Sequence, residues 1–254
     1  MQLNNRYGNL ASHVYNLDKH IGKSFGDVEF YRERLRDSTG PILEPAVGNG
    51  RVLIPLLDAG LQVVGFDASQ EMLDHCTREC AARSLSPHVT RQTFEDFAYD
   101  ECFEAVIIPA GSFQLITDHS VAMAALKRIF DHLLPNGRVI LDVDPIGSVL
   151  SGASGIRRWT TQDGDLLTLT AQLAETDFVA QTTVSHLRYD RWRAGQLAAS
   201  ELEFFSLRWW GVEELGLALR ATGFVDVTVS GNYQHGKAPE NDDRSITFEA
   251  RRPA

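Results

Sequence analysis

The sequence predicts an α/β fold in which a doubly wound, mostly parallel sheet carries an antiparallel β insert. Between residues 42 and 143, short apolar runs typical of strands alternate with longer helical segments. Between residues 156 and 210 the pattern changes to strands joined by turns, and a helix and two strands follow residue 211. Strands that alternate with helices connect by right-handed crossovers, so we expect helices on both faces of the sheet. The ligand crevice of such a sheet lies at the carboxyl ends of its strands.

The elements follow in order along the chain. Asp27 is the expected N-cap of a helix over residues 28–36, and Gly40 with Pro41 ends that helical region. In the core we expect strands at residues 42–44, 63–66, 104–109 and 138–143, with helices at 52–59, 71–82 and 120–134. Residues 162–165 and 193–196 are the expected hairpin tips of the insert. The last elements are a helix at 212–222 and strands at 225–229 and 245–250.

This pattern divides the chain into three parts. Residues 1–40 are expected to form an N-terminal helical lid. Residues 41–155 and 211–254 form the ligand-binding core. Residues 156–210 form the antiparallel insert, which we expect to cap the substrate side.

Composition excludes several classes of function. The chain of 254 residues has a formal net charge of −10, and its basic residues are scattered. Such a chain repels phosphate backbones, so we expect no nucleic-acid partner. A run of about 18 apolar residues is missing and the first ten residues lack a leader pattern, so we expect a cytoplasmic protein without a membrane partner. The oligomeric state stays open, with a homodimer as one alternative.

The cysteines argue against a metal or disulfide framework. Cys76, Cys80 and Cys102 form no Cys-x-x-Cys pair and are odd in number. A secreted disulfide scaffold or a zinc ribbon needs paired spacing, so we expect neither, and we expect no metal. Cys76 and Cys80 are expected to pack on one face of a helix.

Two acids and two glycines form the most informative pattern. One strand ends in Glu44, a loop with Gly48 and Gly50 follows, and the next strand ends in Asp67. Glycines let the backbone approach a ligand closely, and Asp67 can accept both hydroxyls of a ribose that sits across the first loop. A dinucleotide-binding loop needs a third glycine near Leu53, and a Walker loop needs Gly-Lys-Ser/Thr, and neither is present. The pattern therefore predicts a nucleoside site, with an ordinary glycine turn as the alternative.

With these residues the sequence resembles the class I S-adenosylmethionine-dependent methyltransferases that act on small molecules. Residues 44–50, Glu-Pro-Ala-Val-Gly-Asn-Gly, match the first motif of that family, with Ala46 in place of its usual first glycine. The resemblance covers residues 41–144 and continues weakly through the last helix and strands. It implies a seven-stranded Rossmann-like methyltransferase sheet, S-adenosylmethionine as the cofactor and S-adenosylhomocysteine as the product.

The resemblance also implies roles for single residues. Glu44 would organise the loop near the methionine ammonium, and Asp67 would bind the ribose hydroxyls. For the adenine amino group, alignment on Phe97 favours Thr93, and Asp96 is the other candidate; Phe94 would flank the ring, or be an ordinary core residue. The remaining residues expected to contact the cofactor are Tyr15, Ala46, Gly48, Gly50, Ala68, Met72, Pro109 and Ala110.

The substrate is expected to meet the cofactor where the strand at residues 104–109 ends. Ser112, Phe113 and Gln114 follow that strand, and Asp144 follows the next one. The segment lacks the Asn/Asp-Pro-Pro-aromatic motif of enzymes that methylate base amino groups, which again disfavours DNA.

The insert is rich in tryptophan and arginine. Trp159 is a candidate for an aromatic lid, but packing is the favoured interpretation, because strands favour aromatics for packing alone. Arg191 and Arg208 are candidates to bind a carboxylate or phosphate of the substrate, although a solvated face is the default interpretation. The complete sets are Trp159, Trp192, Trp209, Trp210, and Arg157, Arg158, Arg188, Arg191, Arg208.

No residue is assigned as a catalytic base. His13, Asp144 and His235 fall near the expected crevice, but methyl transfer needs mainly a positioned nucleophile and a site shielded from water. The sequence therefore predicts a methyltransferase that acts on N or O of a small-molecule acceptor. Two alternatives remain: aminobutyryl transfer or cyclisation that releases methylthioadenosine, and a protein that binds the cofactor without turnover.

Overall fold

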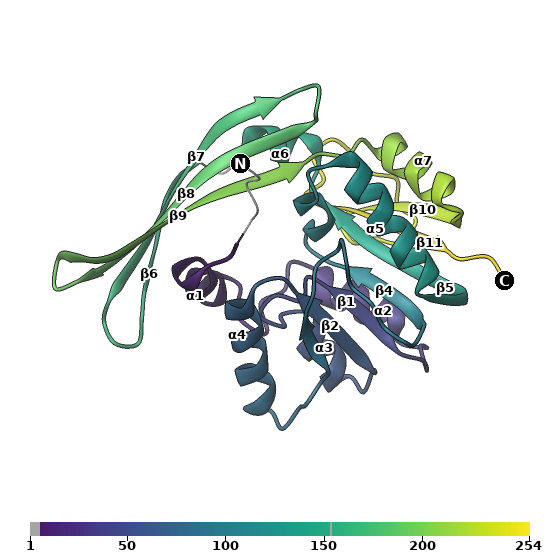
Figure 1. Cartoon of the computed structure of the whole chain (residues 1–254), viewed down its shortest axis with the longest axis horizontal. Coiled ribbons are helices and arrows are strands. Elements are labelled where there is room, and N and C mark those ends of the chain that lie inside the picture. Colours follow the sequence, from purple (N-terminus) through teal and green to yellow (C-terminus); the bar gives the residue numbers. More distant parts are fainter. Residues whose placement is uncertain (1–5, 153) are drawn as a thin grey trace.

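The computed structural model describes residues 6–152 and 154–254, and it confirms the predicted α/β fold with an antiparallel insert (Figure 1). Seven strands form the main sheet in the order β10-β11-β5-β4-β1-β2-β3. They are β1 (Ile42–Pro45), β2 (Val63–Asp67), β3 (Val89–Arg91), β4 (Phe103–Ile108), β5 (Leu133–Val143), β10 (Val225–Gly231) and β11 (Ile246–Arg251). Strands β1 to β5 are mutually parallel, and β11 runs antiparallel to both β5 and β10.

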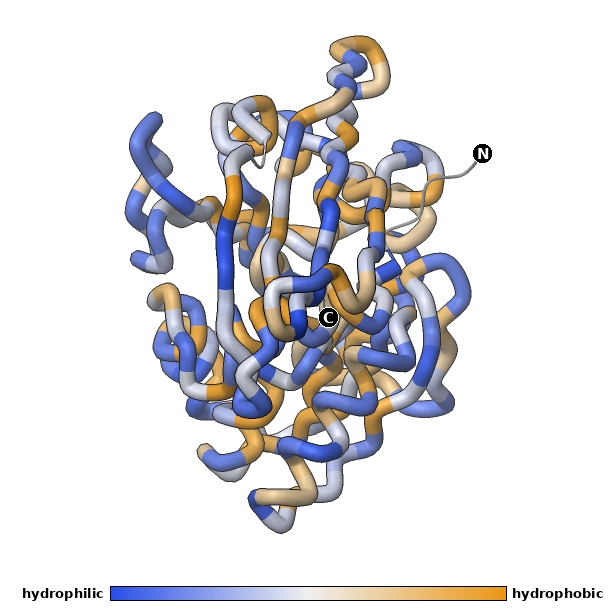
Figure 2. The backbone as a smooth tube through the Cα atoms, turned by 90° about the vertical axis from the view of Figure 1, so that its left-hand side faces the viewer, coloured by the Kyte–Doolittle hydropathy of each residue, from blue (hydrophilic) through white to orange (hydrophobic). Residues whose placement is uncertain are grey.

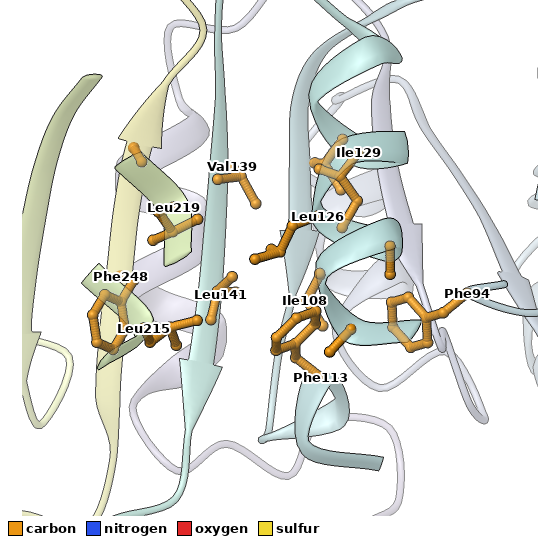
Figure 3. Packing of buried hydrophobic residues seen from close by; sticks show 14 of the residues in the cluster. Phe94, Ile108, Phe113, Leu126, Ile129, Val139, Leu141, Leu215, Leu219 and Phe248 are labelled. Atoms are coloured by element: carbon orange, nitrogen blue, oxygen red, sulfur yellow. The ribbon is translucent and has the colours of Figure 1, made fainter. Parts of the chain in front are cut away.

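Helices cover both faces of this sheet. One face carries α2 (Asp27–Leu35), α3 (Leu53–Asp58) and α4 (Gln70–Ala81), and the other carries α5 (His119–Asp131) and α7 (Val212–Thr222). Alternate residues of β5 serve the two sides: Val139 and Leu141 join the α5/α7 cluster, and Ile140 joins the α2/α3/α4 cluster. In Figure 3, Leu126 and Leu219 lie against these strands from the two helices. The period-two burial is what a strand covered on both faces requires.

The insert is a separate four-stranded antiparallel sheet. Its strands follow sequence order: β6 (Gly155–Thr160), β7 (Leu166–Asp177), β8 (Thr182–Arg193) and β9 (Gln196–Arg208). Polar and apolar residues alternate along these long strands, which extend well beyond the core (Figures 1 and 2). The face that carries Leu167, Leu187 and Tyr189 packs on helix α1 (Asn9–Asp18).

Residues 1–40, which we expected to act as one lid, form two helices with different neighbours. Helix α1 lies between the insert and α4 (Figure 1). Helix α2 instead buries Tyr31 and Leu35 in the core cluster beside α3. Residues 1–5 of the expected lid, and residue 153 of the expected core, lie outside the described residues.

Several boundaries differ from the predictions for local reasons. Asp27 is the first residue of α2 rather than its N-cap, because its carboxylate binds Arg51 as well as the backbone N–H of Phe25 and Val28. Helix α5 ends at Asp131 instead of residue 134, because Leu133 pairs with β4 and Pro135 disfavours a helical residue before it.

Two elements carried no clear signal in the sequence. The turn at residues 178–181 between β7 and β8 has no glycine or proline; the Asp177 carboxylate forms it by accepting hydrogen bonds from the backbone of Val179 and Ala180. The short helix α6 (Ile146–Ser151) precedes the insert. No helix within the described residues has the length and apolar character needed to cross a membrane.

Candidate active site

A cavity of about 210 Å³ opens at the carboxyl ends of β1, β2 and β4. Its walls come from the β1–α3 loop, the end of β2, the start of α4, the loop after β3 and the segment after β4. Nine residues expected at the cofactor or substrate line it: Tyr15, Ala46, Gly48, Asp67, Ala68, Met72, Thr93, Phe94 and Ser112. The tertiary structure therefore gathers at one place residues that are up to 97 positions apart in sequence, from Tyr15 to Ser112.

Asp67 lies in the cavity wall with both carboxylate oxygens fixed. Oδ2 accepts a hydrogen bond from the Gly48 N–H at 2.8 Å, and Oδ1 accepts one from the Ser69 N–H at 2.8 Å. Burial raises the pKa of Asp67, while these N–H donors lower it. The carboxylate thus connects the β1–α3 loop to the start of α4 and keeps free lone pairs for hydroxyl donors.

The β1–α3 loop uses left-handed backbone at three positions. Ala46 has φ +53°, Gly48 has φ +59° and Gly50 has φ +85°. A Cβ on Gly50 would lie 2.9 Å from Cys76 Sγ, so Gly50 serves close packing of the loop on α4 and does not line the cavity. Ala46 adopts a conformation that costs a residue with a Cβ about 1 kcal/mol, so the replacement of the family's first glycine stores local strain.

Glu44 lies behind this loop. It is 2% exposed, and its Oε2 has no hydrogen-bond partner among the described residues. Burial raises the pKa of Glu44 well above its ordinary value, and the positive charge of Arg51 opposes that shift. Glu44 is not part of the cavity wall, so any contact of Glu44 with a ligand in the cavity must go through the loop or through water.

The loop after β3 separates the two candidates for an adenine contact. Thr93 and Phe94 line the cavity, whereas Asp96 does not. The Asp96 carboxylate accepts hydrogen bonds from the Thr93 backbone N–H at 3.1 Å and from the Thr93 hydroxyl at 2.7 Å. Asp96 thus shapes the turn that presents Thr93, and the Phe94 ring packs edge-on against Phe66 and Phe113.

The segment after β4 is held by Asp142, near the end of β5, and by Asp144, directly after β5. Asp142 accepts a hydrogen bond from the Ala110 N–H at 3.1 Å, and the Gln114 side chain bonds the Asp144 backbone at 2.7 Å and 3.4 Å. Gln114 and Phe113 are fully buried, and neither lines the cavity. Pro109 and Ala110 also lie outside the cavity wall. Of the expected substrate-side segment, only Ser112 faces the cavity.

Asp144 has a different environment from Asp142. No described residue donates a hydrogen bond to its carboxylate, and Oδ2 lies 3.4 Å from the position a Cβ on Gly111 would take. Burial raises the pKa of Asp144, and the charge of Lys19 on α1 lowers it. Asp144 is not in the cavity wall, but it lies close to Gly111, the chain neighbour of the cavity-lining Ser112. A partly exposed carboxylate without a donor is suited to receive a cationic or hydrogen-bonding group.

The insert contributes no residue to the cavity wall. Trp159 packs beside the α1 cluster under Arg157, whose guanidinium lies 4.9 Å above its ring. Arg208 is buried and bonds Glu214, Gln181 and the Ala180 carbonyl. Arg191 bonds His13 on α1 at 3.1 Å, and His235 lies 3.8 Å from Glu249. The four tryptophans likewise lie outside the cavity wall.

Ten further residues line the cavity that the sequence did not single out. They are Tyr7, Phe66, Ser69, Gln92, Glu95, Leu115, Ile116, Thr117, Asp118 and Val121. Tyr7 is held because its carbonyl accepts a hydrogen bond from the Ser69 hydroxyl at 2.9 Å and its N–H bonds Glu203 of the insert at 2.8 Å. Of these residues, only Ser69 could have been predicted from the sequence, because a serine directly before a helical pattern is typical of an N-cap. In the structure its hydroxyl caps α4 by accepting a hydrogen bond from the Met72 N–H.

Comparison with known proteins agrees with this geometry. A family model described as a methyltransferase domain matches residues 42–137. The chain is similar to the putative methyltransferase YqeM of Bacillus subtilis, at 29% identity over 104 residues. That alignment covers 41% of this chain and 42% of the length of YqeM, less than half of each protein. It is also similar to the cypemycin N-terminal methyltransferase of a Streptomyces species, at 27% identity over 203 residues, which cover 76% of this chain and 75% of that protein.

Solved structures share the fold over nearly the whole chain. The sugar N-methyltransferase KedS8 from a Streptoalloteichus species superposes with a TM-score of 0.72 over 100% of this chain and 98% of that one, at 21% identity. The matched residues 42–137 contain Glu44, the glycine loop and Asp67, the motif on which the resemblance rested. Residues 42–137 therefore match a methyltransferase domain, and the whole chain has the fold of S-adenosylmethionine-dependent methyltransferases.

Proposed function

We propose that the chain transfers a methyl group from S-adenosylmethionine to a nitrogen of a small-molecule amine. We choose nitrogen as the methyl acceptor because of the Asp144 carboxylate. This carboxylate accepts no hydrogen bond from the described residues, and it lies beside the segment that lines the cavity. Two similar proteins are named as methyltransferases of an N-terminus and of a sugar nitrogen, which supports the same choice.

The residues that line the cavity suit the cofactor chemically. Asp67 has free acceptor positions for the two ribose hydroxyls, and a Cβ at Gly48 would come 3.2 Å from Met72 Cε, so a side chain there would narrow the cavity. Thr93 and Phe94 would receive the adenine, with Gln92 and Glu95 from the same loop. Glu44 would order the β1–α3 loop, and Tyr7 and Tyr15 would cover the ligand from the N-terminal side.

The chemistry is a displacement at carbon. When bound, the cofactor supplies an electrophilic methyl group; the amine nitrogen forms the new N–C bond as the S–C bond breaks, and S-adenosylhomocysteine leaves. The amine must be neutral when it attacks, so its extra proton has to leave the site. Asp144 would pair with the arriving ammonium and orient it, and the pKa of Asp144, raised by burial, makes this carboxylate a better proton acceptor than an exposed aspartate. The remaining task of the protein is to position the two reactants and exclude water.

Product analysis tests the reaction. Purified protein is incubated with S-adenosylmethionine, with and without an extract of small metabolites, and every adenosine-containing product is identified by mass spectrometry. We expect S-adenosylhomocysteine that depends on the extract, together with an extract component heavier by one methylene. Methylthioadenosine above the uncatalysed level would instead indicate aminobutyryl chemistry. Bound but unconverted cofactor would indicate a binding protein.

Asp67→Ala tests the ribose contact. The variant loses an acceptor for two hydroxyls and also the bonds that tie Gly48 to Ser69, so cofactor affinity should fall by about 1–3 kcal/mol, roughly 5- to 150-fold. Isothermal titration calorimetry with S-adenosylhomocysteine measures it. The exposed Asp100→Asn should keep the wild-type affinity. Equal affinity of Asp67→Ala and wild type would refute the assignment of Asp67.

Asp144→Asn tests recognition of the amine. The substitution keeps the size of the side chain but removes its charge, so KM for the amine should rise roughly tenfold or more while cofactor affinity stays unchanged. Steady-state kinetics with the acceptor found above, at pH 7 and pH 9, measures the change. Because a neutral amine needs no counter-ion, the difference from wild type should shrink at pH 9. A loss of cofactor affinity, or an unchanged KM, would count against this role for Asp144.

A further inference from the structure

Four basic side chains lie near one another outside the cavity, where α1 contacts α4 and the insert, and their charges act on one another. His13 lies on α1, His75 and Arg78 lie on α4, and Arg191 lies on β8. Figure 1 shows α1 between the insert and α4, and both neighbours contact it. Tyr15 faces the cavity, and His13, two residues earlier, is turned by about 200° around the helix. The cluster therefore lies on the side of α1 that points away from the cofactor site.

The hydrogen bonds within this cluster determine which groups remain free. Arg191 Nη2 lies 3.1 Å from His13 Nδ1, and Arg78 Nη2 lies 3.0 Å from His75 Nδ1. A guanidinium only donates, so both imidazoles must accept at Nδ1 and, when neutral, carry their proton on Nε2. Every polar group that the cluster still presents is thus a donor: two imidazole Nε2–H groups and the unused guanidinium N–H groups.

Within the described part of the chain, these two arginines lack a carboxylate partner, whereas half of the other arginines have one. Nine arginines form ion pairs with Asp or Glu: Arg34, Arg36, Arg51, Arg83, Arg138, Arg157, Arg188, Arg193 and Arg208. Arg78 and Arg191 instead bond only a histidine, and Arg191 Nε is buried without a hydrogen-bond partner. A group of positive side chains without a carboxylate partner, one of which has a buried N–H group without an acceptor, can bind an anion.

The surrounding charges leave the cluster positive. Asp74 and Glu79 on α4 act on His75, and Asp165 at the start of β7 acts on Arg191 but is bonded to Arg193 at 2.7 Å and 2.9 Å. Arg157 of β6 is paired with Asp18 of α1. Burial lowers the pKa of His13, and the charges of Arg191 and Arg78 lower it further. Burial and the charge of Arg78 likewise lower the pKa of His75.

We propose that His13, His75, Arg78 and Arg191 form a binding site for a phosphate group, separate from the cofactor cavity. A tetrahedral dianion can accept from several directions at once and balances the charges of both arginines, which a single carboxylate does not. Free phosphate and the phosphoryl group of a phosphorylated small molecule share this chemistry. Because the donors come from three elements, a bound phosphate would also hold α1 between α4 and the insert.

Histidine NMR of the full-length protein tests the site. The Hε1 resonances of His13 and His75, assigned by their loss in His13→Gln and His75→Gln, are followed as inorganic phosphate or a phosphomonoester, glucose 1-phosphate, is added at constant ionic strength. A bound dianion stabilises imidazolium, so the titration midpoints of both histidines should rise, while potassium chloride alone should leave them unchanged. Tighter binding of glucose 1-phosphate than of phosphate would point to a phosphorylated small molecule, and the reverse to the free ion.

Arginine variants identify the donors. Arg191→Gln and Arg78→Gln should each weaken phosphate binding roughly tenfold or more, since each removes charge-assisted hydrogen bonds. Arg158→Gln, on the outer face of the same insert, should bind as wild type does. Arg78 is exposed, so its substitution tests the site even where Arg191→Gln fails to fold. The proposal is overturned if phosphate shifts the histidines no more than chloride does, or if both glutamine variants bind phosphate as wild type does.

Discussion

Asp27→Ala is expected to lower the free energy of unfolding by about 3–5 kcal/mol, the cost of leaving a buried charge without its partner. The side chains of Asp27 and Arg51 are 1% and 4% exposed, and they form a two-pronged ion pair. Although burial raises the pKa of Asp27, the hydrogen bond and charge of Arg51 hold it below its ordinary value. Without Asp27, Arg51 keeps only the Lys23 carbonyl at 3.1 Å as a hydrogen-bond partner among the described residues.

Urea unfolding followed by circular dichroism measures this loss. Asp37→Ala is the matched control, because Asp37 also pairs with an arginine but is 89% exposed, and its loss should change stability by less than about 0.5 kcal/mol. Arg51→Met completes a double-mutant cycle, and the double variant should be more stable than Asp27→Ala alone, since no unpaired charge remains. Additive effects of the two single substitutions would show that the pair is not coupled.

Asp142 should make the folded protein lose stability as pH rises through the weakly acidic range. Its carboxylate is 1% exposed and accepts hydrogen bonds from Ala110, Tyr233 and Thr247, but it has no cationic partner. Burial raises the pKa of Asp142 from 3.8 to about 6, and these hydrogen bonds oppose the shift. The folded protein therefore holds a proton that the unfolded chain has already released. The stabilisation is fully present below pH 3.8 and is lost as pH rises through about 6.

The change between these limits amounts to about 3 kcal/mol, from a pKa difference of roughly two units at about 1.4 kcal/mol each. We expect the difference in unfolding free energy between wild type and Asp142→Asn to shift by this amount between pH 4 and pH 7, in favour of the variant at the higher pH. Urea unfolding of both proteins at each pH measures it. Other buried acids with raised pKa values, such as Glu44 and Glu203, occur in both proteins, so their contributions cancel. Parallel pH profiles would contradict the prediction.

The sequence predicted the central fold because its signals are local. Apolar runs of strand length, alternating with helices, specify a doubly wound sheet whatever their neighbours are. The acids at the ends of β1 and β2 were placed correctly for the same reason, since parallel neighbouring strands bring their carboxyl ends together. Asp67 was therefore expected beside the glycine loop, and its carboxylate does bond the Gly48 N–H.

Predictions failed where two distant segments had to meet. Gln114 was expected on the substrate side, but it is buried and its side chain binds the Asp144 backbone. Tyr7 lies at the cavity only because Glu203, 196 positions away, and Ser69 hold its backbone there. Arg208 was a candidate for a substrate anion, and the structure pairs it with Glu214 instead. Local sequence patterns do not predict hydrogen-bond partners that come from distant segments.

By itself, the sequence determined the sheet, the insert and the acidic and glycine residues of the cofactor motif, because these depend on periodicity and on spacing within one βαβ unit. Only the tertiary structure decided which side chains are free to meet a ligand. Asp142 on β5 accepts hydrogen bonds from three donors, whereas the carboxylate of Asp144, directly after β5, accepts none from the described residues. Of the insert's arginines, Arg191 alone bonds His13. The physical reason is that distant segments supply the hydrogen-bond partners of a polar side chain. Where they supply them, the side chain is satisfied within the protein; where they do not, it can bind a ligand.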